Sequence, residues 1–532
     1  MSLKRKSSTQ SPRKRRRTTI YLDADVLHII ALLVTFDITT MHAAILVNSM
    51  WCSIFIRELW KRPFSLVPSD TRGALLIDIL AKCLPREIQQ QLNIYHPPHQ
   101  QPRFRYPTLV RELDFGRFCS YTKYWNKAIY PAVCVGLLKQ FNELSHFSFP
   151  DIVGHCSLAR SLIKENTLFL DNIQYLEFHT RTPIAKQVYD FLCTHSRSIK
   201  TLAIYGTSTK TRSLQLQRLI ESQNDLCNIT ITTFQLDQKI SLSHAQRLTH
   251  LELNSVVICS GSLDGFVECQ NLKALILISC LFESTDALKP FVVLSKLRSF
   301  EFMESLYNDK ANFYTTPNIN QFIYSRGNTL SQLRVSVNMK SDLHLFMTTI
   351  ATRCLGLLEL TLEVDDPTLV ADLPVNLLCG SSTLEKLVIC HDKIAILDEG
   401  YWSLPAADAI LRHILPCTNL RHLKLIEWSF EKKNTLTTFL DQFNGRLEYV
   451  SWYVKIEEAS ISKYAQRCLR AIRKCMLRKG GGNVTIDCNE HSHYDDLEHV
   501  VMYEIVAKLK WPCAQIRVQG GEEKCYKRRR LT

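Results

Sequence analysis

The sequence lacks the features of a membrane, secreted or fibrous protein. Its 532 residues contain no uninterrupted run of about 18 apolar residues, the length that a membrane-spanning helix needs. No apolar stretch follows the basic start of the chain, so no secretory signal is predicted. Glycine and proline number only 17 and 18, which excludes collagen-like and low-complexity classes. With 46% hydrophobic residues, the chain is predicted to be a globular intracellular protein with a large core and no membrane partner.

The 19 cysteines form neither a metal-binding nor a disulfide pattern. No two of them fall in a C-x-x-C spacing, and the closest pair is Cys468 and Cys475. We therefore expect reduced, mostly buried thiols. One cluster has side chains of the metal-binding type: Cys488, His491, His493 and Asp495. Because no matching second pair accompanies it, a solvated loop is predicted there and no metal site.

Motifs of catalysis are also absent from the sequence. It contains no G-x-G-x-x-G, no G-x-S-x-G, no P-loop and no H-E-x-x-H. The run Gly480 to Gly482 lacks the following Lys and Ser or Thr of a phosphate-binding loop, and is predicted to form a turn before a final strand. The chain is therefore expected not to be an enzyme and to need no cofactor.

Basic residues are concentrated at the two ends of the chain. Of the formal net charge of +14, residues 1–19 hold +8 and residues 524–532 hold +5, without any acid, which leaves +1 for the residues between. A folded nucleic-acid-binding body would carry clustered Lys and Arg on its own surface, so such a body is not predicted. Short basic tails are typical of nuclear import signals, of non-specific polyanion binding, or of solvated ends.

The first tail resembles a bipartite nuclear import signal. Its sequence is KRKSSTQSPRKRRR, and RKRRR alone satisfies the single-block form. An acidic groove of an import receptor would pair with its basic residues, Lys4, Arg5, Lys6, Arg13, Lys14, Arg15, Arg16 and Arg17. Ser11 lies between the two blocks, where a phosphate would add about −2 charge and weaken that pairing. A nuclear location is predicted, with a cytoplasmic pool left open.

One apolar pattern recurs from residue 144 onward. It consists of an apolar residue, two variable residues, a second apolar residue, one variable residue and a third apolar residue. The pattern begins at Leu144, Ile173, Ile199, Leu226, Leu248, Leu272, Leu297, Leu330, Leu357, Leu384, Leu420 and Leu447. Nine of the eleven spacings between neighbours fall within 20–29 residues, the period of leucine-rich repeats.

The spacing within each pattern predicts a short strand. Its last three positions alternate as in a strand buried on one face, and its first apolar residue turns the chain into that strand. Segments with helical periodicity lie between the strands, as in AKQVYDFLCTHSRS from Ala185 and SDLHLFMTTIATRC from Ser341. Neighbouring units are predicted to stack into a curved α/β solenoid, with parallel strands on the concave face and helices outside. A doubly wound sheet is the alternative, but its strands would lack the repeated leucine.

The segment before the repeats has a different texture. Residues 20–66 are nearly free of Gly and Pro and have helical periodicity, which predicts about three short helices. Such a bundle is too small to bury its own core well and is expected to need a partner. Residues 94–107 contain four prolines and are predicted to be an exposed loop. RYPTLVRELDFGRF, which begins at Arg105, is predicted to be a first, poorly matching repeat.

From Tyr21 to Leu66 the sequence resembles the F-box. The opening leucine, acidic residue, aliphatic pair and following helix positions of that family match Leu22, Asp25, Val26, Leu27, Ile30 and Leu33. Its acidic-aliphatic pair, its V-N-x-x-W and the closing L-W-x-x-P-F of fungal members match Asp37, Ile38, Val47, Asn48, Trp51, Leu59, Trp60, Pro63 and Phe64. Where the family has a proline after the opening leucine, this chain has Asp23.

An F-box followed by leucine-rich repeats is the architecture of substrate receptors in Skp1-cullin-F-box ubiquitin ligases. The resemblance implies that the helical module binds a Skp1-like adaptor joined to a cullin scaffold. It also implies that the repeats hold a substrate protein, while a separate conjugating enzyme performs the chemistry. Two alternatives stay open. One is a nuclear repeat scaffold that does not engage Skp1, favoured by Asp23 and the basic tails, and the other is a nucleic-acid-associated protein that uses the tails alone.

Two interaction surfaces are predicted. The bulk of the apolar stripe in the helical module predicts that part of it is exposed until Skp1 covers it, and the implied adaptor-binding residues are Leu22, Asp25, Val26, Leu27, Ile30, Val47 and Trp51. The alternation of side chains along each strand predicts which residues point to the concave face. These are mainly acidic in the early repeats and basic or aromatic in the late ones. Because binding hot spots favour aromatic and basic side chains, substrate contacts are expected at His422, Lys424, Tyr449 and Tyr453.

The predicted organisation has five segments. They are a disordered basic tail at 1–19, an F-box-like helical module at 20–66, a helical linker with an atypical capping repeat at 67–143, a leucine-rich-repeat solenoid at 144–518, and a basic C-terminal tail at 519–532.

Overall fold

A computed structural model of the chain describes residues 22–35, 37–67, 69–91, 93, 102–122, 130–149, 172–179, 185–206, 210–236, 245–303, 315–337, 343–364, 383–391, 408–426, 435–443, 445, 447–456, 466–474, 476, 483–491 and 501–510. The chain divides into two compact units: unit 1 comprises residues 1–177 and 182–188, and unit 2 comprises residues 178–181 and 189–532. Among the described residues, no helix has the length and apolar character needed to cross a membrane.

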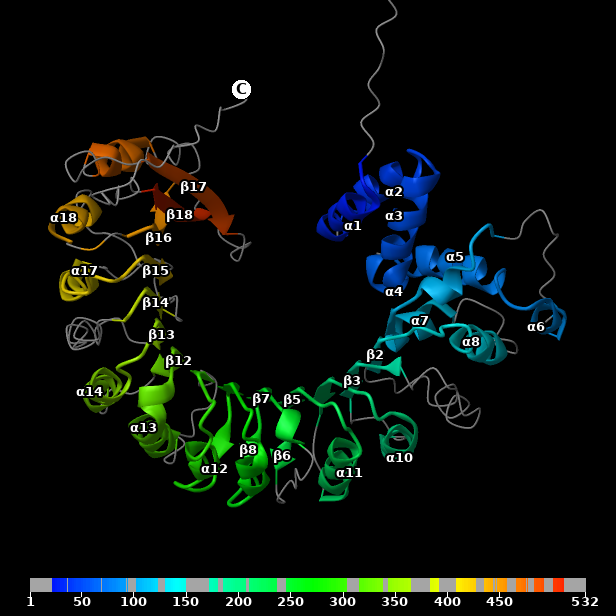
Figure 1. Ribbon diagram of the computed structural model, residues 1–532, viewed down its shortest axis with the longest axis horizontal. Coiled ribbons are helices and arrows are strands. Elements are labelled where there is room, and N and C mark those ends of the chain that lie inside the picture. The colour runs from blue at the N-terminus through cyan, green and yellow to red at the C-terminus, as the bar shows by residue number, and fades with distance from the viewer. Residues whose placement is uncertain are drawn as a thin grey trace, which may run out of the picture. The chain divides into compact units, whose positions relative to one another are not determined.

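Unit 1 is mainly helical (Figure 1). Its elements are α1 (Ala24–Leu33), α2 (Ile38–Ile45), α3 (Ser49–Lys61), α4 (Pro63–Leu66), α5 (Asp70–Ala81), α6 (Arg86–Gln91), the 3-10 helix η2 (Tyr106–Leu109), β1 (Glu112–Asp114), α7 (Phe115–Thr122), α8 (Tyr130–Leu138) and β2 (His146–Phe149). The strand β3 (Tyr175–His179) and the helix α10 (Ala185–His195) lie at the division between the units.

The first three helices enclose a small core of their own. Its buried members are Leu27, Ala31, Met41, Ala44 and Phe55. Two residues of the F-box-like pattern cap helices. The Asp37 carboxylate accepts a hydrogen bond from the backbone N–H of Thr40 at the start of α2, and the Asn48 side chain accepts one from the backbone N–H of Trp51 at the start of α3, each at 3.0 Å. The hydrogen bond from the Thr40 hydroxyl lowers the pKa of the Asp37 carboxyl. The polar residues of the pattern thus have a structural role as helix caps.

The residues that follow α3 join the helices to the first strands of unit 1. Phe64 is fully buried, and its ring lies edge-on to Phe118 with centroids 5.3 Å apart. Trp60 stacks on Tyr106 with centroids 4.0 Å apart. The poorly matching first repeat supplies β1, which pairs in parallel with β2. Strand pairing therefore begins in this segment, ahead of the first recognisable motif.

Unit 2 alternates strands with helices or short turns. Its further strands are β4 (Thr201–Tyr205), β5 (Asn228–Thr232), β6 (Gln235–Leu236), β7 (His250–Asn254), β8 (Val257–Ile258), β9 (Ala274–Ile278), β10 (Leu281–Phe282), β11 (Ser299–Met303), β12 (Gln332–Val337), β13 (Glu359–Val364), β14 (Lys386–His391), β15 (His422–Ile426), β16 (Tyr449–Ile456), β17 (Asn483–His491) and β18 (Val501–Lys510). Its helices include α11 (Lys210–Glu221), η5 (Ala245–Arg247), η6 (Asp264–Glu268), α12 (Lys289–Val292), α13 (Thr315–Arg326), η7 (Gly327–Thr329), α14 (Leu343–Arg353), α17 (Asp408–His413) and α18 (Thr435–Gln442), and residues 466–474 are helical as well.

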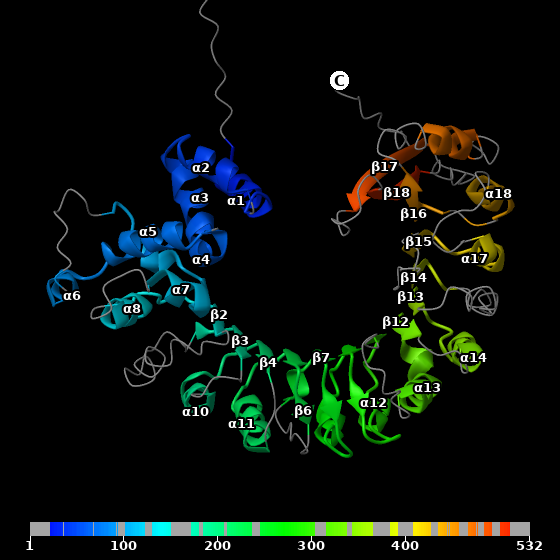
Figure 2. The same cartoon turned by 180° about the vertical axis from the view of Figure 1, so that it is seen from behind.

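The recurring apolar pattern forms the core of the repeats. In all twelve copies the three apolar side chains are buried, each with 5% or less of its surface exposed. Each copy contains one strand, and within unit 2 the neighbouring strands from β4 to β16 pair in parallel. In unit 2 the strands line the inner side of the curve and the helices lie outside it (Figures 1 and 2). The predicted α/β solenoid with a long parallel sheet is confirmed. The strands do not form the doubly wound sheet that was the alternative.

The middle repeats of unit 2 differ from the prediction of outer helices. Between β5 and β11 the outer side carries the 3-10 helices η5 and η6, the short helix α12 and a second sheet formed by β6, β8 and β10. The spacings here are 22, 24 and 25 residues, which leave too few residues for a full helix. After each inner strand one residue has positive φ, at Thr233, Ser255 and Ser279, and turns the chain into the second sheet.

The last strands of unit 2 correct two predictions. Strand β18 pairs antiparallel with β16 and with β17, so the parallel arrangement ends at β16. Because β17 extends from Asn483 to His491, it includes Cys488 and His491, which were predicted to lie in a solvated loop. His493 and Asp495 lie outside the described residues.

The burial of the cysteines is less uniform than predicted. Of the twelve described as free thiols, five are buried and seven are partly exposed. Cys417 is disulfide-bonded, so the expectation of reduced thiols is wrong at this residue.

Candidate functional site

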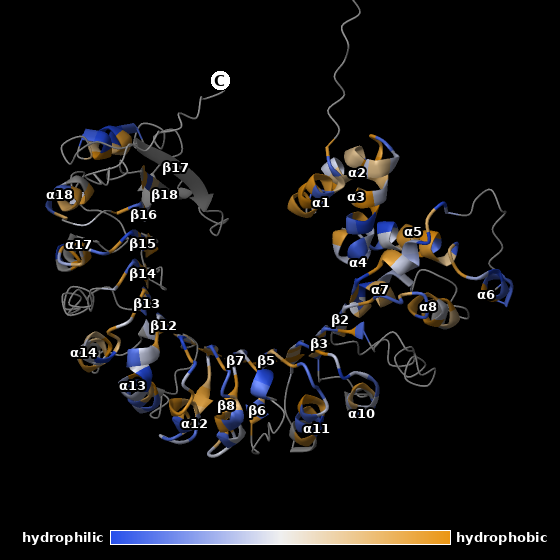
Figure 3. Ribbon diagram, in the orientation of Figure 1, coloured by the Kyte–Doolittle hydropathy of each residue, from blue (hydrophilic) through white to orange (hydrophobic). Residues whose placement is uncertain are grey.

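A row of large apolar side chains is exposed along α1 and the residues just before it. Leu22, Val26, Ile29 and Leu33 are 37%, 43%, 57% and 77% exposed. The spacing of three and four residues places Val26, Ile29 and Leu33 on one face of the helix, and Leu22 lies two residues before its first turn. Figure 3 shows the strongly hydrophobic colour of α1. We call these four residues the α1 row. Contiguous exposed apolar side chains of this kind are typical of protein-binding surfaces.

A second exposed apolar group lies where α2 leads into α3. Leu46 is 85% exposed, Val47 is 56% exposed, and Met50 in the first turn of α3 is 39% exposed. The three-helix module therefore buries one set of apolar residues in its core and leaves another set in water.

The residues predicted to bind the adaptor fall into two groups. Leu22, Asp25, Val26 and Val47 are exposed and available to a partner. Leu27 is fully buried in the core of the module, while Ile30 and Trp51 are partly buried against that core. The Trp51 ring stacks on Phe55 with centroids 5.4 Å apart. These three residues therefore hold the helices together beneath the exposed surface.

Sequence reasoning missed part of this surface. Ile29 and Leu46 were not predicted as contacts, although they are among the most exposed apolar residues of the module. The signal for Ile29 was present in the sequence, because it lies three residues after Val26 and four before Leu33 on the same helix face.

The inner strand face carries a chain of charges across three repeats. Arg334 on β12 donates to Glu301 on β11 at 3.0 Å, and to Glu363 on β13 at 2.5 Å through its Nη2. Glu363 is only 5% exposed. Burial raises the pKa of the Glu301 carboxyl, an effect that the Arg334 charge opposes. Burial lowers the pKa of the Arg334 guanidinium, but the hydrogen bond to Glu363 and the charges of Glu363 and Glu301 together more than offset this, and the pKa is raised.

The predicted substrate contacts lie on the strands that follow. The register places Lys386, His422 and Tyr449 in one row across β14, β15 and β16. The rings of His422 and Tyr449 stack with centroids 5.9 Å apart. Lys424 lies two residues further along β15, opposite Ser451 on β16. The side chain of Tyr453 lies outside the described residues, as do the basic residues of the first tail.

Along the inner strand face, the change from acidic to basic side chains is smaller than the sequence suggests. Lys386 is paired with Glu359 at 3.1 Å, and the half-buried Arg334 is enclosed by two acids. Glu363 was missed because it lies one position beyond the recurring pattern. Its alternation with Glu359 and Thr361 on β13 was the signal that it lies on the same face. In the described part of the chain, no group of three His, Cys, Asp or Glu residues is arranged to hold a metal ion.

Comparison with known proteins gives structural likenesses only. No protein-family model matches the sequence, and no curated protein matches it. The solved structures include an internalin from Listeria monocytogenes, at 15% identity and a TM-score of 0.29, over 51% of this chain and 80% of that one. A protein from Bacteroides fragilis has 11% identity and a TM-score of 0.29, over 58% and 75%. The leucine-rich-repeat ectodomain of the receptor kinase GASSHO1/SCHENGEN3 from Arabidopsis thaliana has 12% identity and a TM-score of 0.24, over 58% and 38%.

The fold class follows from the chain itself. Twelve buried motifs at a leucine-rich-repeat period, with their strands in parallel register, define a solenoid of the leucine-rich-repeat type.

Proposed function

We propose that the protein is the non-catalytic substrate-recognition subunit of an SCF-type ubiquitin ligase. In this proposal α1 to α3 bind Skp1, and through it a cullin, while the inner strand face of the repeats binds a substrate protein. The observation that carries the proposal is the α1 row, together with Leu46 and Val47, on a module whose core is formed by other residues. The resemblance of residues 21–66 to the F-box supplies the identity of the partner.

The proposed mechanism is proximity. A bound substrate lysine is held near a conjugating enzyme carried by the same assembly, so the effective concentration of the lysine at that enzyme rises. This chain contributes binding and orientation, and no residue of it takes part in bond making. The affinity for Skp1 comes from removing the α1 row from water, at roughly 25 cal/mol per Å² of apolar surface covered.

Capture of the full-length protein by immobilised Skp1 tests the proposal. We expect the double variant Leu22→Ala, Val26→Ala to lose most of the captured protein, because it removes two exposed side chains and no core residue. The matched control is Leu355→Ala, Leu358→Ala, which truncates two leucines of the repeats that are 61% and 42% exposed. Equal capture of both variants and the wild type, at unchanged thermal stability, would reject an adaptor surface at α1.

A second candidate is a nuclear repeat scaffold that does not engage Skp1. Two features of the sequence favour it: Asp23 replaces the usual proline at the start of the module, and both tails are basic. Asp23 is the N-cap residue of α1 but makes no side-chain capping hydrogen bond. If wild-type protein fails to bind Skp1 while Asp23→Pro binds, the scaffold is the better description.

The proposed location is the nucleus, through an import receptor that reads the basic tails. Full-length fusions test this: neutralising residues 4–17 and 524–530 together is expected to move the protein to the cytoplasm, whereas either change alone leaves import intact. A wild-type fusion that stays cytoplasmic with nuclear export blocked would show that the tails are not import signals.

A further inference from the structure

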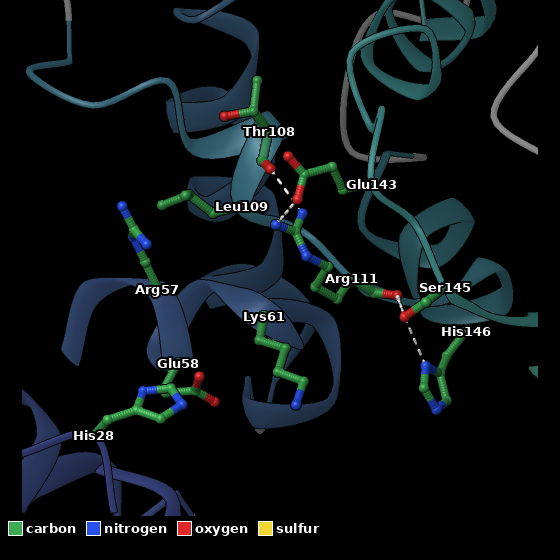
Figure 4. A pocket seen from close by; sticks show the side chains of 10 residues that line it. All are labelled: His28, Arg57, Glu58, Lys61, Thr108, Leu109, Arg111, Glu143, Ser145 and His146. Carbon is green, nitrogen blue, oxygen red and sulfur yellow. Dashed lines mark hydrogen bonds and ion pairs between the residues drawn. The ribbon is translucent and has the colours of Figure 1, made fainter. Parts of the chain in front are cut away.

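Unit 1 contains a cavity of about 580 Å³ that neither proposed surface uses. Its walls come from α1, α3, η2 and the residues just before β1 and β2, so the helical module and the first strands both contribute (Figure 4). Volumes of this size are typical of small-molecule sites. The charged side chains that line it are Arg57, Glu58, Lys61, Arg111 and Glu143, with His28 and His146 beside them.

Two cations in this cavity form no ion pair, although the acids Glu58 and Glu143 line the cavity as well. Arg57 and Lys61 are four residues apart on α3, so they project from the same face of the helix. Within the described part of the chain, neither side chain has an ion-pair or hydrogen-bond partner. Exposed Lys and Arg side chains without partners are common on open surfaces, but here both line one cavity together with a third cation. Their charged groups point apart in Figure 4, so an anion that paired with both would draw these two flexible side chains toward each other.

The third cation is held in place by the protein. Arg111 donates from Nη1 to the Thr108 carbonyl at 2.9 Å and forms an ion pair with Glu143. Figure 4 shows both interactions converging on its guanidinium. Burial lowers the pKa of Arg111, and the like charge of Arg57 lowers it further. Arg57 and Arg111 are thus close enough to repel each other, and an anion between them would relieve that repulsion.

An acceptor in the cavity is also without a donor. The Oε2 atom of Glu58 is buried and has no hydrogen-bond partner among the described residues. Its charge opposes a purely anionic ligand, but its lone pairs would suit a ligand hydroxyl once the carboxylate turns this buried oxygen toward the cavity. On the far side, the Ser145 hydroxyl lies 2.9 Å from His146 Nδ1 and 3.3 Å from the Arg111 carbonyl, which fixes both side chains at the wall.

We propose that this cavity binds a small phosphate-bearing molecule that also carries hydroxyl groups, as a sugar phosphate does. Arg57 and Lys61 bind the phosphate, Arg111 adds charge at a fixed position, and Glu58 accepts from a ligand hydroxyl. A phosphate suits the site better than a carboxylate because its three terminal oxygens can meet several cations at once. The inference concerns a separate site and does not depend on the proposed role in a ubiquitin ligase.

Calorimetric titration of the full-length protein with glucose 6-phosphate tests the proposal. We expect glucose 6-phosphate to bind saturably, and we expect neither glucose nor sulfate to bind in this way at the same concentration. Arg57→Gln, Lys61→Gln is expected to weaken it by about tenfold or more, since each charge-assisted bond to phosphate is strong. The matched control, Arg72→Gln, Arg86→Gln, removes the same charge from exposed positions on α5 and α6, and is expected to bind as the wild type does.

Two further measurements separate the parts of the proposal. Glu58→Ala is expected to weaken glucose 6-phosphate binding while strengthening pyrophosphate binding, because it removes both the acceptor and the repulsion. In the wild type, glucose 6-phosphate is expected to protect Lys61 from acetylation and to leave exposed Lys273 reactive. The proposal is overturned if no binding is detected at millimolar ligand, if both double variants behave alike, or if sulfate binds equally well. Tighter binding of a phosphoserine peptide would also overturn it, in favour of a protein partner.

Discussion

Gly73 on α5 packs so closely against the ring of Tyr121 on α7 that a Cβ on Gly73 would lie 2.2 Å from two ring carbons. The ring cannot easily withdraw, because the Tyr121 hydroxyl donates to the Val67 carbonyl at 3.1 Å. Tyr121 also packs near Phe64, the aromatic residue at the centre of this part of unit 1. The absence of a side chain at Gly73 is therefore what lets α5 and α7 meet.

Gly73→Ala is accordingly expected to destabilise unit 1 by about 1–3 kcal/mol, the range for overpacking a filled interior. The measurement is the thermal unfolding midpoint by calorimetry. Gly356→Ala serves as the control, because the nearest atom to its added Cβ is the Asn328 carbonyl oxygen at 3.9 Å, an ordinary contact. If the two variants unfold at the same temperature, the close approach in unit 1 is looser than described.

Two buried thiols should be chemically inert in the folded protein. Burial raises the pKa of Cys134 in unit 1 and of Cys280 in unit 2 to about 12. Since the thiolate is the reactive form, neither is expected to be alkylated by iodoacetamide at pH 8, whereas partly exposed Cys227 is. Peptide mapping by mass spectrometry before and after denaturation checks this. Rapid native-state modification of Cys280 would contradict the burial.

Glu301 makes the stability of unit 2 depend on pH. Burial raises the pKa of its carboxyl above the ordinary value, so on acidification the folded chain takes up this proton before the unfolded chain does. The contribution of Glu301 to stability is therefore fully present below its unfolded pKa, and it is lost as the pH rises through its higher folded pKa.

Glu301→Gln should remove that dependence while leaving Arg334 paired with Glu363. Calorimetric unfolding midpoints at pH 7 and pH 5 provide the measurement. On going from pH 7 to pH 5, the wild type is expected to gain stability relative to the variant. A wild type that instead loses stability relative to Glu301→Gln would show that the Arg334 charge outweighs burial at this carboxyl.

The strands of the repeats were predictable from the sequence because their determinants are local. In a copy such as Leu248 to Leu253, the apolar positions alone specify a turn into a strand and one buried face. The outer side of the middle repeats was less predictable. Short connections there allow either a compressed helix or a pair of turns, and the residues with positive φ that decide between them, such as Ser255, are not glycines.

The interaction surfaces were harder to predict, because their contacts join residues that are far apart in the sequence. Arg334 meets Glu301 and Glu363 across 33 and 29 residues, so its partners follow only from the strand register. The cavity in unit 1 brings Arg57 to Arg111 from distant parts of the chain. The exposed row on α1, in contrast, could be read from helical spacing, although which of its neighbours become core was decided by packing against Phe55.

The last prediction concerns substrate binding on the inner strand face. His422 and Tyr449 form a stacked aromatic pair on neighbouring strands, with Lys424 on the same strand as His422. Aromatic and basic side chains grouped in this way favour a partner with acidic and apolar character. The combined variant Lys424→Glu, Tyr449→Ala, Tyr453→Ala is therefore expected to lose proteins that co-purify with the wild type in quantitative affinity capture, while Skp1 capture is unchanged. The control is Gln332→Ala, Thr361→Ala on β12 and β13, which removes polar side chains from earlier strands. A bound protein set that is identical for the wild type and the combined variant would place the substrate site elsewhere.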